Sequence, residues 1–125
     1  MDIFFQKLKK HELFEFLIGR GLGLTPSGDD IINGIIFYNH NICSGNYLNL
    51  ANINKIFNKT NIFSQNMLEY SLKNCYNGFF PELSRITNTG SEKKIVHLLT
   101  KVYGATSGID TAIGLIFADR IRHLN

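Results

Sequence analysis

Two stretches of this chain, 80 residues apart, carry the same short pattern ahead of an apolar run. The first reads SGDDIINGIIF from Ser27, and the second reads SGIDTAIGLIF from Ser107. When 25–37 is aligned with 105–117, six of thirteen positions are identical: Ser27/Ser107, Gly28/Gly108, Asp30/Asp110, Gly34/Gly114, Ile36/Ile116 and Phe37/Phe117. Any fold for this chain must therefore use one local structure twice.

The repeated pattern is typical of the start of a helix. A serine followed three residues later by an acid resembles a capping box, and the carboxylate lies favourably in the positive first turn. Gly34 and Gly114 follow the aspartates by four residues, one turn further on the same face. A glycine inside a helix costs about 1 kcal/mol relative to alanine. We therefore expect two capped helices that cross closely at these glycines.

Helix capping does not account for everything in the first copy. Gly19, Gly21 and Gly23 alternate just before it. Asp29 and Asp30 are adjacent carboxylates at one helix start. Two helix N-termini facing one cleft would concentrate N–H donors, which suits a phosphate or carboxylate. Acids beside such an anion would fit Mg²⁺ between them, because Mg²⁺ prefers oxygen ligands. A structural role at the helix starts and contact with a ligand explain Asp29, Asp30 and Asp110 equally well.

Apolar residues recur at helical spacing along most of the chain, and few segments alternate as a strand does. We predict helices over 2–18, 29–40, 46–58, 62–77, 81–88, 91–103 and 109–123, with a stop at Gly78 and a turn at 88–91. An apolar content of 44% in 125 residues suffices for one core. The prediction is an all-α, compact single-domain helical bundle over 1–125, with two similar Ser-Gly-x-Asp helix starts.

Charge and cysteine content narrow the class of protein. The net charge is +3 and the basic residues are scattered, apart from KLKK at 7–10, so we expect no nucleic-acid partner. Cys43 and Cys75 lie far apart, which fits a reduced, cytoplasmic compartment. No signal peptide is recognised, and no apolar stretch approaches the roughly 20 residues that span a bilayer. We expect no membrane partner.

Common catalytic motifs are missing. A Walker A loop needs Gly-Lys-Ser/Thr, whereas Gly28 is followed by two acids. The GxGxxG fingerprint fails at Leu24 or Pro26, and neither HExxH nor GxSxG occurs. The four histidines show no metal-ligand spacing.

The glycine-rich stretch and two later elements resemble the AllH-like family. The signature Gly-x-Gly-x-Gly-Leu-Thr-Pro-Ser-Gly-Asp-Asp matches 19–30 at each defined position. The family's Arg-Thr-Thr-x-x-Ser element is similar to 59–64, where lysine replaces arginine and asparagine replaces a threonine. Its closing Gly-His-Ser-Ser-Gly-x-Asp element is similar to 104–110, with Ala105 at the histidine position and threonine for one serine. The likeness covers about 18–119.

This resemblance implies a role in purine-nitrogen metabolism. The family includes a subunit of oxamate carbamoyltransferase, the enzyme of anaerobic allantoin breakdown. That complex interconverts oxalurate plus phosphate with oxamate plus carbamoyl phosphate, and it uses two other kinds of subunit. The chain resembles the C-terminal half of the family's members. Partner subunits or a homo-oligomer are therefore expected.

The resemblance and the helix starts together define the expected site. Loop amides and two serine hydroxyls would hold a small anionic metabolite, such as carbamoyl phosphate or oxamate, with a cation from Arg20 or Lys59. Asp30 and Asp110 are the candidate catalytic residues, because deprotonating the attacking amide needs a base. The expected ligand-binding residues are Gly19, Arg20, Gly21, Gly23, Thr25, Ser27, Gly28, Asp29, Lys59, Thr60, Ser107 and Gly108.

Two other functions compete with this interpretation. One is a non-catalytic helical module, whose glycine-rich loop and paired glycine helices hold a partner subunit or a second copy of the chain. The other is a Mg²⁺-dependent hydrolase that uses Asp29, Asp30 and Asp110. Mg²⁺ is the one cofactor that the residues suggest.

Overall fold

The described part of the chain is built from helices. The computed structural model describes residues 10–41, 50, 52–73, 80–89 and 91–124, and no strand occurs within these ranges. The elements are α2 (Lys10–Leu17), α3 (Ser27–Asn41), the 3-10 helix η1 (Ile53–Lys59), α4 (Ile62–Leu72), α5 (Phe80–Thr89), α6 (Glu92–Tyr103) and α7 (Ala105–Leu124). The all-α prediction is confirmed.

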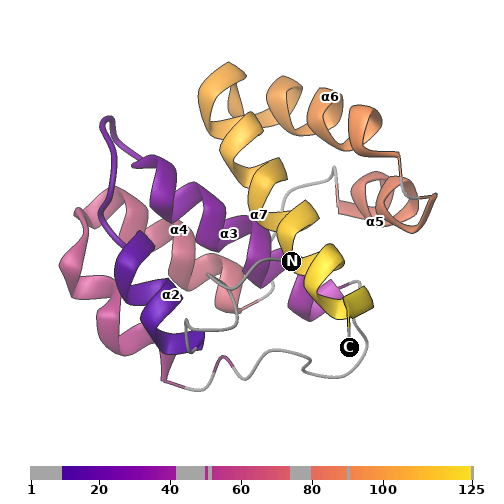
Figure 1. Ribbon diagram of the computed structural model, residues 1–125. Helices are drawn as coiled ribbons and strands as arrows, with labels where there is room; N and C mark the ends of the chain where they lie inside the picture. The colour runs from indigo at the N-terminus through magenta and orange to yellow at the C-terminus, as the bar shows by residue number, and fades with distance from the viewer. Residues whose placement is uncertain (1–9, 42–49, 51, 74–79, 90, 125) are drawn as a thin grey trace.

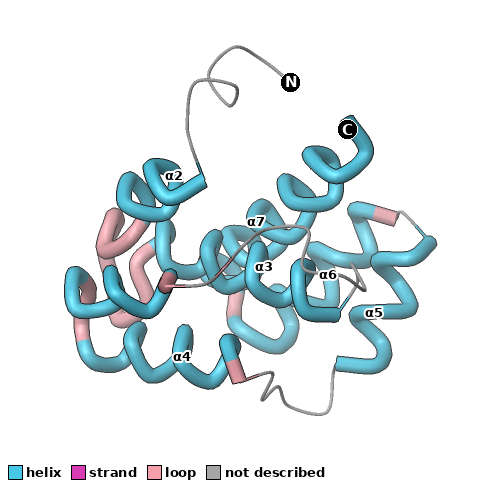
Figure 2. The backbone as a smooth tube through the Cα atoms, turned by 90° about the horizontal axis from the view of Figure 1, so that it is seen from below, coloured by secondary structure: helices cyan, strands magenta, loops and turns pink. Residues whose placement is uncertain are grey.

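The two helices that carry the repeat, α3 and α7, pack against each other in the middle of the molecule (Figure 1). α2 and α4 pack against α3, and η1 contacts both of them. α6 packs against α7, and α5 packs against α6. Figures 1 and 2 both place α2 and α4 on one side of the central pair and α5 and α6 on the other. The repeat therefore forms the structural centre of the fold.

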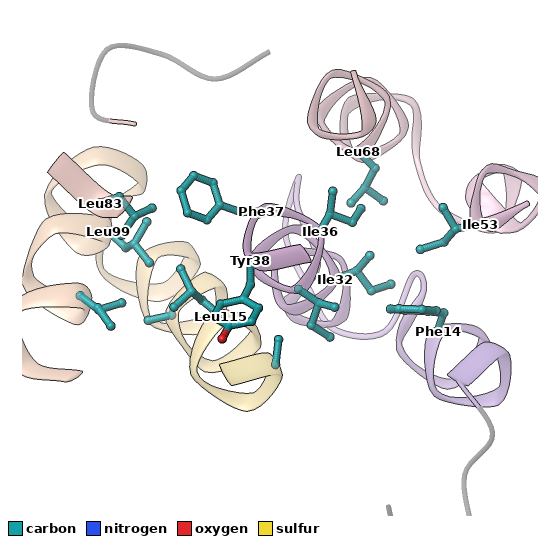
Figure 3. Close-up of a cluster of buried hydrophobic side chains, with 14 of the residues drawn as sticks. Phe14, Ile32, Ile36, Phe37, Tyr38, Ile53, Leu68, Leu83, Leu99 and Leu115 are labelled. Atoms are coloured by element: carbon teal, nitrogen blue, oxygen red, sulfur yellow. The ribbon is translucent and has the colours of Figure 1, made fainter. Parts of the chain in front are cut away.

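Helix α3 is enclosed on all sides by the other helices. Ile36 points toward Leu68 of α4, Ile32 lies on the side of α3 that faces Phe14 of α2, and Tyr38 lies beside Leu115 of α7 (Figure 3). Every residue from Gly28 to Asn39 except Ile31 is buried. This burial includes polar side chains, and buried polar groups need hydrogen-bond partners to be tolerated. The polar residues at the start of α3 are thus the unusual feature of the core.

The glycines of the repeat lie at the α3–α7 crossing, as the sequence predicts. A Cβ added at Gly34 would lie 2.0 Å from the carbonyl oxygen of Thr111. A Cβ added at Gly114 would lie 1.9 Å from the carbonyl oxygen of Ile31. Ile31 and Thr111 occupy the same position in the two copies, so the contacts are reciprocal, as in two segments related by a local two-fold axis. The close approach offsets the helical cost of both glycines.

Both repeat helices begin earlier than the sequence predicts. α3 begins at Ser27, where the Pro26 carbonyl accepts hydrogen bonds from the amides of Asp29 and Asp30. α7 begins at Ala105 because Gly104, at φ +94°, ends α6 and its carbonyl accepts from the Gly108 amide. Neither serine of the repeat is therefore the residue that caps its helix, and the capping-box interpretation is wrong in this respect.

Several other boundaries differ or fall outside the described residues. The part of the predicted 46–58 helix that is described is η1, a 3-10 helix that starts after Asn52, whose φ of +72° would interrupt an α-helix. Predicted residues 2–9 and 74–77, the stop at Gly78 and both cysteines lie outside the described ranges. α5 and α6 match their predicted segments within a few residues. In the described ranges, no helix is long and apolar enough to cross a membrane.

Candidate functional site

The starts of α3 and α7 meet, and their side chains are linked by a chain of hydroxyl groups. Thr25, just before α3, donates from Oγ1 to Oδ2 of Asp30 at 3.3 Å. The same Thr25 oxygen lies 3.1 Å from Oγ of Ser107 on α7. Either oxygen can donate in that contact, but each hydroxyl has one proton, so a hydroxyl that donates to Asp30 can only accept from the other. The two copies of the repeat are thus joined at Asp30.

Asp30 is a buried acid with an altered pKa. Only 2% of the surface of Asp30 is exposed. The pKa of Asp30 is raised to about 7, mainly by burial and with a smaller contribution from the charges of Asp110 and Asp29, while hydrogen bonds from the hydroxyls of Ser107 and Thr25 oppose this rise. Both protonation states of Asp30 are therefore populated near neutral pH. Such perturbed acids are concentrated at functional sites, because general acid–base chemistry needs a pKa close to the working pH.

Polar side chains from four helices surround this acid. Oδ2 of Asp110 is buried and has no hydrogen-bond partner within the described residues. Burial raises the pKa of Tyr103, at the end of α6, with a contribution from the charge of Asp30, while a hydrogen bond to Asn33 opposes it. Asn33 in turn accepts a short hydrogen bond from Ser71 of α4. The polar cluster is defined here as Thr25, Asp30, Asn33, Ser71, Tyr103, Ser107 and Asp110.

Three members of the polar cluster were not predicted from the sequence: Asn33, Ser71 and Tyr103. The available signal was Asn33, a polar residue inside the apolar run IINGIIF, where the second copy has Ile113. Ser71 and Tyr103 carry no comparable local signal, because only the tertiary structure brings their hydroxyls to Asn33.

Asp29 has a different role from its neighbour. One carboxylate oxygen accepts from the Gly19 amide at 2.7 Å, and the other accepts a short hydrogen bond from the Thr60 hydroxyl at the end of η1. Asp29 is fully buried, so these donors compensate for the loss of water. Asp29 therefore ties the glycine-rich loop to η1.

The three aspartates do not form a shared metal site. Among the described residues, no three His, Cys, Asp or Glu side chains come close enough together to hold a metal ion. Asp29 is occupied by Gly19 and Thr60, while Asp30 and Asp110 lie in the polar cluster. The expectation that Asp29, Asp30 and Asp110 jointly bind Mg²⁺ is corrected in this respect.

The glycine-rich loop takes left-handed backbone conformations at Gly19, Gly21 and Gly23, with φ of +73°, +115° and +95°. Two of its expected N–H donors are used inside the protein: Gly19 donates to Asp29, and Gly28 donates to the carbonyl of Arg20 at 2.8 Å. Within the described residues, no hydrogen bond engages the amides of Gly21 and Gly23. These amides are the loop donors that an anion could use.

The far side of this loop is fixed to α4. The carbonyl of Leu24 accepts from Nδ2 of Asn61 at 2.8 Å, and Asn61 also accepts from the amide of Ser64 as the N-cap of α4. The element at 59–64 thus supports the loop through Thr60 and Asn61.

The remaining expected residues have packing or surface positions. A Cβ at Gly28 would lie 1.8 Å from the Leu17 carbonyl oxygen, and a Cβ at Gly108 would lie 2.3 Å from Cα of Thr100, so both glycines allow helices to pack closely. The Arg20 guanidinium lies 3.9 Å from the Phe16 ring centroid, and its Nε donates to the Phe16 carbonyl at 2.8 Å. Lys59 is exposed, and its carbonyl lies against Gly19.

Replacing Thr60 with valine tests how firmly Asp29 holds the loop. We expect Thr60→Val to lower the free energy of unfolding by about 2 kcal/mol, because a buried carboxylate loses one of its donors. Urea unfolding at pH 7 measures the difference. Thr106→Val, at an exposed position on α7, is the matched control. Equal losses in the two variants would contradict the role assigned to Thr60.

A scan against protein-family models matches residues 17–119 to the family described as oxamate carbamoyltransferase subunit AllH. The matched range contains the glycine-rich loop, α3, α7 as far as Asp119 and the complete polar cluster. No curated protein and no solved structure matches the chain.

Proposed function

This chain belongs to the family of oxamate carbamoyltransferase subunit AllH, and on that premise we propose that it is a subunit of a carbamoyltransferase-type complex and binds a small anionic metabolite where α3 and α7 begin. The observation that carries the proposal is the joining of two helix N-termini by Thr25 and Ser107 beside Asp30. Helix N-termini favour anions through their dipoles and unpaired amides. At the start of α3 the amides of Gly28, Asp29 and Asp30 donate inside the protein, so α3 contributes its dipole, while the start of α7 and the loop contribute amides. The ligand class is a small carboxylate or phosphate, such as oxamate or carbamoyl phosphate.

Asp30 supplies the proton chemistry in this proposal. When oxamate is carbamoylated, its amide nitrogen attacks the carbonyl carbon of carbamoyl phosphate. The new N–C bond forms, the C–O bond to phosphate breaks, and the nitrogen loses a proton to a base. A carboxyl with a pKa of about 7 accepts that proton near neutral pH and can return it in the reverse reaction. Asp110 acts through its charge, which helps to raise the pKa of Asp30.

The loop amides and the first turn of α7 supply electrostatic stabilisation in the same proposal. Negative charge develops on the carbamoyl oxygen during the attack, and fixed N–H donors stabilise it without reorganising. The amides of Gly21 and Gly23 and the hydroxyl of Ser107 are the candidate donors. The reaction belongs to purine-nitrogen breakdown, and other subunits provide the remainder of the catalytic site.

The alternative of a non-catalytic module receives less support from the packing. The paired glycines Gly34 and Gly114 contact each other's helices within the chain, so they do not present a surface to a partner. One feature does favour a partner: an apolar groove of about 180 Å³ between α2, α3 and α7 has exposed Phe16 and Ile113 on its rim. Binding to other subunits is compatible with both functions.

Thermal unfolding of the purified chain tests the anion site. We expect carbamoyl phosphate, oxamate or phosphate to raise Tm by several degrees, because a ligand at 100 times its Kd adds about 2.7 kcal/mol of stability. Ser107→Ala should remove most of the shift. Ser91→Ala is the control, because Ser91 is the N-cap residue before α6 and its side chain makes no capping bond.

The outcomes of this experiment are distinct. A shift that survives in Ser107→Ala would place the anion elsewhere on the protein. An unchanged Tm with all three anions would contradict the anion site, while membership of the family would stand.

A further inference from the structure

A cleft of about 640 Å³ lies between α5 and α6, on the side of the central helix pair opposite α2 and α4 (Figure 1). Its walls carry four basic side chains, Arg85 on α5 and Lys93, Lys94 and Lys101 on α6. The basic residues look scattered in the sequence, and the antiparallel return of the chain from α5 to α6 gathers these four. The cleft is therefore a surface that only the packing reveals.

This basic cleft accounts for the charge of the whole protein. Glu82 is the one acid among its lining residues, which leaves a net charge of +3, equal to the net charge of the entire chain. The remainder of the molecule is thus neutral overall. Concentrated charge of one sign steers and orients partners of the opposite sign.

Two cations of the cleft, Lys93 and Lys94, are unfavourably placed on the helix that carries them, whereas Lys101 lies in the last turn of α6, where the dipole favours it. Lys93 and Lys94 lie in the first turn of α6, where the helix dipole disfavours positive charge. The acid in that turn, Glu92, pairs instead with Arg120 of α7 at 2.6 Å. In the described part of the chain, no ion pair engages Arg85, Lys93, Lys94 or Lys101. The like charges remain available to a partner.

The shape of the cleft favours an extended partner over a compact anion. Lys93 and Lys101 are eight residues apart, about 12 Å along the axis of α6. These side chains are exposed and spread along the groove, so they do not converge on one point. The buried side chains of Ile86 and Leu98 line the cleft between them. Among the described residues that line it, His97 carries the one aromatic ring and no Phe, Tyr or Trp is present, whereas surfaces for single-stranded nucleic acid stack successive bases on several aromatic rings.

We propose that the basic cleft between α5 and α6 is a docking surface for an acidic segment of another protein, in which several Asp or Glu side chains follow the line from Lys93 to Lys101 and an apolar side chain contacts Ile86 and Leu98. The surface is separate from the anion site at the polar cluster, and the proposal does not depend on that site.

A labelled glutamate octapeptide with one central leucine tests the docking surface. We expect fluorescence anisotropy to show binding at low salt that weakens strongly between about 50 and 300 mM NaCl, because exposed charge pairs are screened. The double variant Lys94→Glu and Lys101→Glu should weaken binding by about tenfold or more. Replacing the leucine with glutamine should weaken it by a smaller factor.

The control carries the same change of charge at two lysines that do not line the cleft. Lys55→Glu with Lys73→Glu alters two exposed lysines near η1 and α4, and this variant should keep at least half of the affinity. An equal loss in both double variants would show a general charge effect and would overturn the proposal. So would the absence of peptide binding at low salt, or tighter binding of an oligothymidine of equal charge, which would assign the surface to nucleic acid.

Discussion

Replacing Gly34 with alanine is expected to destabilise the protein by about 3 kcal/mol or more, although alanine is the better helix former. The new Cβ would lie 2.0 Å from the Thr111 carbonyl oxygen and 2.8 Å from the Leu115 amide nitrogen. Both are backbone atoms, so no side chain can rotate away and the helices must separate. Helix propensity alone predicts a gain of about 1 kcal/mol. A lower free energy of unfolding would therefore show that packing dominates at Gly34, and a higher one would show that helix propensity does.

Urea unfolding measures this effect, and the reciprocal contact provides an internal check. Gly114→Ala should cause a similar loss, because its Cβ would lie 1.9 Å from the Ile31 carbonyl oxygen. The double variant should lose less than the sum of the two, since the first substitution already separates the helices. Gly23→Ala is the control: its Cβ meets no atom within 4 Å, and only its positive φ costs about 1 kcal/mol. A stable Gly34→Ala protein would contradict the close crossing.

Replacing Asp30 with asparagine is expected to stabilise the protein at pH 8. The pKa of Asp30 is about 7 in the folded protein against 3.8 for an ordinary aspartate. Below pH 4 the group is protonated in both states and has no effect. Above pH 7 it is ionised in both, and the folded state bears the cost of a buried charge, about 4 kcal/mol. Stability from this group is thus lost as pH rises from about 4 to 7.

The difference between the variant and the natural protein isolates Asp30 from other titrating groups. Urea unfolding at several pH values should show near-equal stability at pH 4 and a more stable Asp30→Asn protein at pH 8. Glu92→Gln, at an exposed ion pair with Arg120, should change stability by less than about 1 kcal/mol at any pH. If Asp30→Asn were less stable than the natural protein at pH 8, the hydrogen bonds from Thr25 and Ser107 to the Asp30 carboxylate would contribute more than its burial costs. Lost anion binding in a stabilised variant would mark Asp30 as functional.

Much of the fold could be predicted from local sequence. Helical spacing of apolar residues identified α3, α5, α6 and α7, because burying one face requires that period. The glycine crossing was predictable because a helical glycine is unfavourable without a close neighbour. The start of α7 was not predictable. It is set by Gly104, which ends α6 and whose carbonyl accepts the first hydrogen bond of α7, and not by the Ser-Gly-x-Asp pattern.

The candidate site was predictable in part. The repeat pointed to Asp30, Asp110 and Ser107, and all three belong to the polar cluster. The adjacent carboxylates Asp29 and Asp30 look alike in sequence, yet successive helix positions project about 100° apart, so they contact different elements. Asp29 binds Thr60, whereas Asp30 lies near Ser107.

By itself, the sequence determined the helical class, the twofold use of one helix start and the glycines at the crossing. Each of these depends on residues within a few turns of one another, whose spacing the chain fixes directly. Only the tertiary structure decided that Asp29 holds the loop, that Tyr103 and Ser71 reach the buried acid, and that four separate cations line one cleft. Those relations join residues far apart in the chain, and packing sets their distances, burial and pKa values.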